Sequence, residues 1–149
     1  MVATIRPDSW NFPLFIHVAG AMLLVGALVV VVATMGGALR RGDGVEVLTS
    51  LAFRTLLIGV LPACILMRAG AEWIASEEDV PDDADWIGIG YSTADGGLLL
   101  TIIAAVLAWR VARRGAAAPG GLARAVLVLA AVLIVAYALA IWAMTAKPG

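Results

Sequence analysis

The sequence predicts an all-α membrane protein, a bundle of four transmembrane helices. Of the 149 residues, 62% are hydrophobic, and the mean hydropathy is +1.00. Soluble domains are less apolar, with an apolar share of about one half. Four stretches also reach the length of roughly 20 apolar residues that is needed to cross the hydrocarbon of a bilayer. We therefore expect a single membrane domain.

The runs of apolar residues place the four helices and the segments that join them. The helices are expected at about 11–39, 48–75, 91–111 and 122–145. An acidic loop is expected at 76–90, and two basic loops at 40–47 and 112–121. The first helix should remain in the mature protein, because its apolar run is much longer than the roughly 7 to 15 residues of a signal-peptide core.

The segregation of charged residues along the chain predicts the orientation. The two basic loops are rich in arginine, whereas the stretch "SEEDVPDDADWIGIG" contains acids and no Lys or Arg. Since Lys and Arg next to a span are retained in the cytoplasm, the acidic loop and both termini should be extracytoplasmic. The abundance of Ala and Gly, and the use of Arg over Lys, are typical of a high-GC bacterial proteome. We therefore expect a multi-pass protein of the bacterial inner (plasma) membrane.

Each expected helix carries a polar residue near its extracytoplasmic end. These are His17 in the first helix, Arg68 and Glu72 in the second, Asp95 in the third and Tyr137 in the fourth. With a rise of about 1.5 Å per residue, all of them lie roughly 5 to 12 Å from the outer ends of their helices. Ionisable groups inside a span usually face the bundle interior or water. We therefore predict a ligand-binding pocket, lined by these five residues, in the outer half of the bundle.

Each of these residues also has a purely structural explanation. Arg68 and Glu72 are four positions apart on one helical face, where they can neutralise each other. Asp95 follows Ser92 by three positions, as in a capping box at the start of a helix. A neutral His17 can hydrogen-bond across helices without binding a ligand. The pocket exists only if the helices are rotated so that His17 and Asp95 face Arg68 and Glu72.

His17 is the only histidine of the chain, and Cys64 is the only cysteine. Imidazole is a ligand of both haem iron and copper, so His17 is the candidate metal ligand. A contact with quinone or a role in proton transfer is the other functional interpretation. One histidine excludes a two-histidine haem within one chain. One cysteine excludes an intramolecular disulfide and a Cys-rich metal site, and Cys64 is expected to be a packing residue.

Small residues four positions apart predict close contacts between helices. Examples are Gly59 with Ala63 and Ala71 with Ala75. Helices in lipid associate largely through close backbone packing, which small residues permit. We therefore expect a tight bundle.

The stretch "LFIHVAGAMLLVGALVV" resembles the first helix of the copper-resistance-D-like and related bacterial four-helix membrane proteins. In that pattern a histidine is followed by small residues and a Val-Gly step, which here are His17, Gly20, Val25 and Gly26. The resemblance covers this one stretch. It implies a small bundle associated with copper or haem, and His17 is the one ligand that it carries over.

The predicted function is the binding of a small ligand or redox cofactor, such as haem, copper or quinone. In this interpretation Arg68 pairs with an anionic group of the ligand, Glu72 holds Arg68, and His17 is a ligand or proton carrier. The alternative is a non-enzymatic accessory or assembly subunit, and a third interpretation is a small transporter or channel formed by an oligomer. The expected partners are the lipid bilayer and either further copies of the chain or a membrane complex, and not nucleic acid.

Enzymatic chemistry is not expected in this chain alone. The sequence has no Gly-rich phosphate loop, no Ser/His/Asp arrangement and no metal-hydrolase motif.

Overall fold

The computed structural model describes residues 9, 11–40, 43–77, 85–114 and 120–146. Within this part of the chain the regular elements are helices. They are α1 (Asn11–Arg40), α2 (Val45–Thr55), the π-helix η2 (Leu56–Val60), α3 (Leu61–Glu77), α4 (Asp85–Ala112) and α5 (Gly121–Ala146). Four helices are long and apolar enough to cross a membrane, since α2, η2 and α3 form one continuous helix of 33 residues, Val45–Glu77. The predicted four-helix bundle is confirmed.

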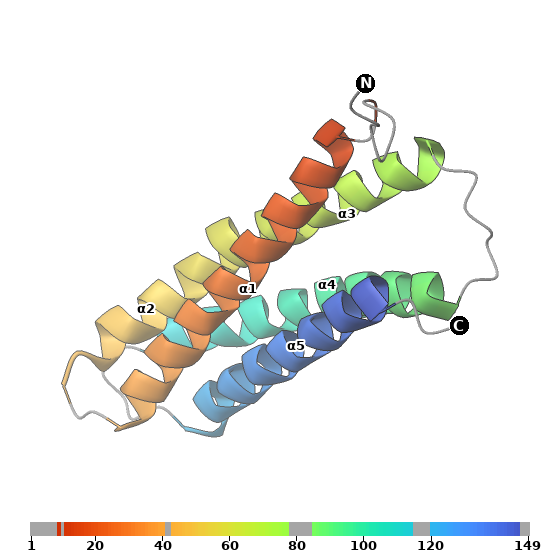
Figure 1. Ribbon diagram of the computed structural model, residues 1–149. Helices are drawn as coiled ribbons and strands as arrows, with labels where there is room; N and C mark the ends of the chain where they lie inside the picture. Colours follow the sequence, from red (N-terminus) through yellow and green to blue (C-terminus); the bar gives the residue numbers. More distant parts are fainter. Residues whose placement is uncertain (1–8, 10, 41–42, 78–84, 115–119, 147–149) are drawn as a thin grey trace.

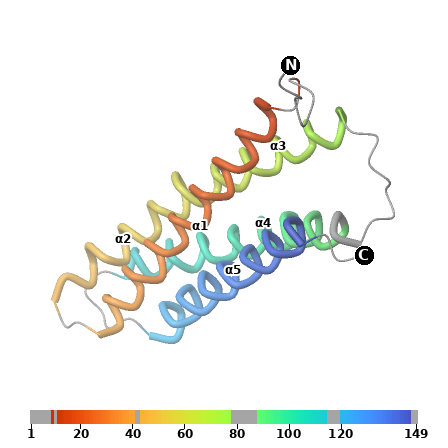
Figure 2. The backbone as a smooth tube through the Cα atoms, in the orientation of Figure 1, coloured from red at the N-terminus to blue at the C-terminus, as the bar shows by residue number. Residues whose placement is uncertain are grey.

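The helices form two pairs that diverge toward one end of the bundle. Helix α1 packs along α2, η2 and α3, while α4 packs along α5. The two pairs separate toward the end at which α1 and α4 begin and α3 and α5 end (Figures 1 and 2). We call this the open end. We call the opposite end the basic end, because Arg40, Arg110 and Arg124 lie there.

Helix α3 begins to diverge from α4 at a change of helical geometry within the continuous helix Val45–Glu77. The five residues of η2 form a π-helical turn, and Pro62 follows directly in α3. Proline has no N–H with which to continue the α-helical hydrogen-bond pattern. Proline and π-bulges are the usual causes of a change in helix direction. Beyond this segment α3 stays close to α1 and contacts α4 only slightly.

The basic half of the bundle is closely packed. Leu28, Val31 and Met35 of α1 are fully buried, as is Leu56 of η2. Four alanines of α4 and α5 are also fully buried, namely Ala104, Ala108, Ala123 and Ala130. The buried hydroxyls of Thr34, Thr49 and Thr101 donate to carbonyls of their own helices, so each of them has a hydrogen-bond partner.

Large apolar side chains are exposed all around the bundle. They include Val29 on α1, Ile58 on η2, Val106 on α4 and Leu139 on α5. An apolar outer surface over long apolar helices is compatible with a multi-pass membrane protein in contact with lipid.

Two boundaries differ from the sequence-based expectation. Helix α4 begins at Asp85 and runs through Ser92 and Asp95, so the predicted capping box at the start of this helix is wrong. Gly88 and Gly90, at the end of the predicted acidic loop 76–90, lie inside α4, and Gly90 packs against α5. Helix α2 begins at Val45 because Gly44 has a φ of 74°, a left-handed conformation that favours glycine. Residues 78–84 of the predicted acidic loop lie outside the described residues.

Candidate ligand-binding site

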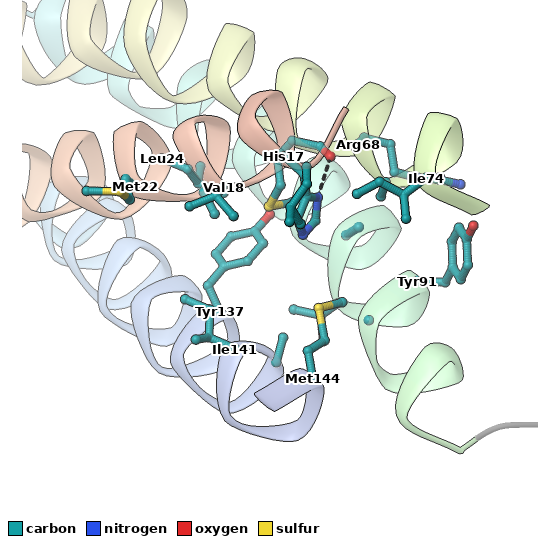
Figure 3. Close-up of a pocket in the computed structure, with 18 of the residues that line it drawn as sticks. His17, Val18, Met22, Leu24, Arg68, Ile74, Tyr91, Tyr137, Ile141 and Met144 are labelled. Atoms are coloured by element: carbon teal, nitrogen blue, oxygen red, sulfur yellow. Dashed lines mark hydrogen bonds between the residues drawn. The ribbon is translucent and has the colours of Figure 1, made fainter. Parts of the chain in front are cut away.

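A cavity of about 770 Å³ lies between the diverging helices at the open end. Its walls come from α1, α3, α4 and α5, and Figure 3 shows the side chains that surround it. Most of the lining is apolar, including Val18, Leu24, Ile141 and Met144. Cavities of roughly 300 to 1,000 Å³ with an apolar lining and a few polar groups are typical of small-molecule sites.

Two glycines bring the backbones of α1 and α3 into direct contact beside the cavity. A Cβ atom on Gly20 would lie 2.6 Å from the backbone nitrogen of Met67, and one on Gly70 would lie 2.6 Å from the backbone nitrogen of His17. No side chain fits at these distances. The two contacts are reciprocal, because each glycine faces the residue that lies three positions before the other glycine.

This close approach fixes the ring of His17. Its Nδ1 lies 2.9 Å from the backbone carbonyl oxygen of Met67. Because a carbonyl oxygen can only accept a hydrogen bond, Nδ1 carries the hydrogen and donates it. In a neutral imidazole the other nitrogen, Nε2, is then an acceptor. Figure 3 shows the Nδ1 edge of His17 turned toward α3 and the other edge turned into the cavity.

Arg68 joins α3 to α4 at the rim of the cavity. Its Nε donates to Oδ1 of Asp95 on α4 over 3.1 Å, and its Nη1 pairs with Oε1 of Glu72 on α3. Its guanidinium also lies over the ring of Tyr91, 4.5 Å from the ring centroid. The pairing of Arg68 with Glu72 that the sequence suggested is confirmed, and Asp95 is a second partner. Two carboxylates and one aromatic ring therefore hold the cation away from the cavity centre.

Two further glycines on α4 accommodate two large side chains of α5. The hydroxyphenyl ring of Tyr137 occupies the space where a side chain of Gly97 would be, and the end of Met144 occupies that of Gly90. Tyr137 is 3% exposed, and its hydroxyl oxygen lies 3.7 Å from the sulfur of Cys64. Tyr137 therefore presents its ring to the cavity, while its hydroxyl contacts Cys64.

Three of the five residues predicted for the site line the cavity, and two do not. His17, Arg68 and Tyr137 are part of the lining, whereas Glu72 and Asp95 are outside it. Both acids are exposed, by 54% and 66% of their side chains, and each holds Arg68 from outside the cavity. The rotation of the helices thus brings Asp95 to Arg68, and both acids support the rim.

Comparisons with protein-family models, with curated proteins and with solved structures found no match for this chain. The resemblance of the first helix to copper-resistance-D-like proteins therefore stays a prediction. Among the described residues, no three His, Cys, Asp or Glu side chains form a group that could hold a metal ion.

The cavity opens sideways between α1 and α5. Val18 and Met22 of α1 and Ile141 of α5 line the cavity and are also exposed on the outer surface, by 46%, 72% and 46%. On the opposite side, the ion pair of Arg68 with Asp95 bridges α3 and α4. The opening has an apolar frame and lies in the part of the surface that long apolar helices present to lipid.

Asp95→Asn is expected to loosen α3 from α4 at the open end, because it removes the charged partner of Arg68 across the two helices. The loss of stability should be less than about 1 kcal/mol, since both side chains are partly exposed. Spin labels on cysteines at Ser76 of α3 and Ser92 of α4, in a Cys64→Ala background, should report a broader distance distribution. Glu72→Gln, which removes a partner within α3 alone, is the matched control. Identical distributions in the two variants would contradict a bridging role for Asp95.

Proposed function

We propose that this protein binds a lipid-soluble small molecule of the quinone class in the cavity at the open end. One observation carries the proposal. An apolar cavity, open sideways toward the apolar surface, exposes a single imidazole edge whose nitrogen has no hydrogen-bond partner among the described residues. Molecules of this class have a flat ring and an apolar tail, which match the apolar lining, and oxygen substituents, which would lie near the imidazole.

The shape and lining of the cavity support this class of ligand. The ring face of Tyr137 and the side chains of Leu24 and Met144 offer apolar contacts to a flat ring. A tail can leave between Val18 and Ile141 without crossing a charged surface. Oxygen atoms on the ring would lie near the imidazole of His17.

The proposal includes an orientation in the plasma membrane of a bacterium. Arg40 ends α1 and Arg110 lies in the last turn of α4, both at the basic end. Since basic residues next to a span stay in the cytoplasm, we place the basic end there and the open end on the extracytoplasmic side. The ligand would then enter from the outer leaflet.

The geometry of His17 also favours a second candidate, a haem or a copper ion. A metal-bound histidine usually donates its other ring N–H to a carbonyl or carboxylate, as His17 does to Met67. The thioether of Met144 lines the same cavity, and a histidine with a methionine is a known ligand pair of haem iron. This candidate predicts a Soret band or one copper per chain in the gently purified protein. A colourless, copper-free protein that binds quinone would exclude it.

The test of the proposed function is binding of decyl-benzoquinone, measured by native mass spectrometry of the protein released from detergent micelles. Ala71→Phe should lower the apparent affinity at least about tenfold, because Ala71 lines the cavity and a phenyl group would fill it. Ala69→Phe is the matched control, since Ala69 is exposed and is not part of the lining. If wild type binds neither decyl-benzoquinone nor its reduced form, decyl-benzoquinol, or if both variants bind the probe like wild type, the proposal is wrong.

A further inference from the structure

A neutral His17 offers the cavity one hydrogen-bond acceptor and no donor. Its Nδ1–H is used by the carbonyl of Met67, and the contacts at Gly20 and Gly70 leave the two helices no room to shift closer. A neutral His17 therefore faces the cavity with the lone pair of Nε2 and with no hydrogen to donate from that nitrogen.

Three other polar groups of the lining already have partners. The hydroxyl of Tyr137 contacts the sulfur of Cys64, and the hydroxyl of Thr145 donates to carbonyls of its own helix. Arg68 is held by Glu72 and Asp95, and Figure 3 shows its side chain running along α3 away from His17. None of these groups donates to Nε2 in the part of the chain that the structure describes.

A ligand oxygen beside His17 therefore meets a hydrogen-bond acceptor. The carbonyl oxygen of a quinone is also an acceptor, so the two lone pairs would face each other in an apolar site without a hydrogen between them. The hydroxyl of a quinol can donate its hydrogen to Nε2. Leaving a buried polar atom unpaired is costly, and sites that pair with a hydroxyl discriminate strongly against analogues that lack it.

We infer that the cavity selects the reduced, hydroxyl-bearing form of its ligand, a quinol or related phenol, over the quinone. This inference rests on the proposed function and narrows its ligand class. His17 is a specificity-determining residue in this interpretation, and it acts as the hydrogen-bond acceptor for the ligand hydroxyl.

The test compares probes with and without a hydroxyl hydrogen. The first pair is 4-decylphenol and its methyl ether, which has the same ring and tail but no hydroxyl hydrogen. The second pair is decyl-benzoquinol, kept reduced under argon, and decyl-benzoquinone. An imidazolium would donate from both nitrogens, so binding of every probe is measured at alkaline pH, about pH 8.

Wild type is expected to bind 4-decylphenol about tenfold more tightly than the methyl ether, and the quinol about tenfold more tightly than the quinone. His17→Leu should reduce both ratios to near one, because it removes both the acceptor for the hydroxyl and the lone pair that faces the carbonyl or ether oxygen. His17→Gln, whose amide has both a donor and an acceptor, should keep binding and lower the ratios to an intermediate value. The wild-type ratios need no variant, so they test the inference even if a variant does not fold.

Two outcomes separate a failure of the proposed function from a failure of the inference. If no probe binds to wild type, the proposed function fails and the inference fails with it. If all probes bind equally, or the quinone binds more tightly, while Ala71→Phe still weakens binding, the cavity is a binding site and the selection for a hydroxyl is overturned.

Discussion

Gly20→Ala is expected to destabilise the protein by about 3 kcal/mol, at the upper end of the range for an overpacked core, and to abolish ligand binding in the cavity. The added methyl group would lie 2.6 Å from the nitrogen and 2.9 Å from the Cα of Met67. These are backbone atoms of a helix and cannot rotate away, so α1 and α3 must separate. Separation also lengthens the 2.9 Å hydrogen bond from His17 to Met67, which orients the imidazole.

The matched control for Gly20→Ala is Gly26→Ala on the same helix. A Cβ atom on Gly26 would have no other atom within 4 Å. Because alanine is the better helix former by about 1 kcal/mol, this variant should be as stable as wild type or more stable. The thermal midpoint in detergent and the binding of decyl-benzoquinone are measured for both. Similar midpoints for the two variants would contradict the direct contact of α1 with α3.

Gly97→Ala is expected to weaken binding at least about tenfold while it lowers stability by only about 1 to 2 kcal/mol. A Cβ on Gly97 would lie 2.8 Å from Cζ of Tyr137 and closer still to its hydroxyl. In contrast to the contact at Gly20, the obstructed atoms belong to the end of a side chain. The ring of Tyr137 can therefore swing into the cavity, which relieves the clash and occupies the ligand's space.

Cys64 gives a direct readout of this movement. It is the only cysteine of the chain, it is 3% exposed, and its sulfur contacts the hydroxyl of Tyr137. If the ring leaves, a maleimide should label Cys64 faster in Gly97→Ala than in wild type. Gly96→Ala is the control, because a Cβ on the neighbouring glycine meets nothing within 4 Å. Equal labelling rates in the two variants would show that Tyr137 does not depend on Gly97.

The fold could be predicted from the sequence because length and hydropathy suffice to identify membrane-crossing helices. The start of α4 could not, because the apolar run begins only near residue 91, whereas the helix itself begins at Asp85. For the same reason, the sequence places Asp95 at a helix N-terminus. In the structure it is well inside α4 and pairs with Arg68 across two helices.

The candidate site could be predicted in part. The depth of a residue follows from its position along a helix, so His17, Arg68 and Tyr137 are correctly expected at the same end. The direction of a side chain depends on helix rotation, and rotation is hard to infer when every face of a helix is apolar. For this reason the sequence does not separate the lining residues from Glu72 and Asp95, which hold Arg68 from outside.

The glycines that shape the site are not among the predicted residues, although the sequence contains two signals for them. Ala-Gly-Ala occurs in "HVAGAM" of α1 and again in "MRAGAE" of α3, and these two glycines make the reciprocal contacts. Gly90 and Gly97 on α4 have the same spacing as Tyr137 and Met144 on α5, which occupy the space beside them. The pairs of small residues from which we predict close packing, such as Gly59 with Ala63 and Ala71 with Ala75, include none of these four glycines.

The sideways opening between α1 and α5 determines what would drive the proposed binding. A ligand that enters between Val18 and Ile141 leaves contacts with lipid acyl chains, and not with water, when it comes into contact with the cavity walls. As for helices that associate within lipid, transfer between two apolar surroundings supplies little hydrophobic free energy. Occupancy then depends on the mole fraction of the ligand in the membrane. A weak intrinsic preference is sufficient when the ligand is abundant there, and tail length matters less than the single polar contact with His17.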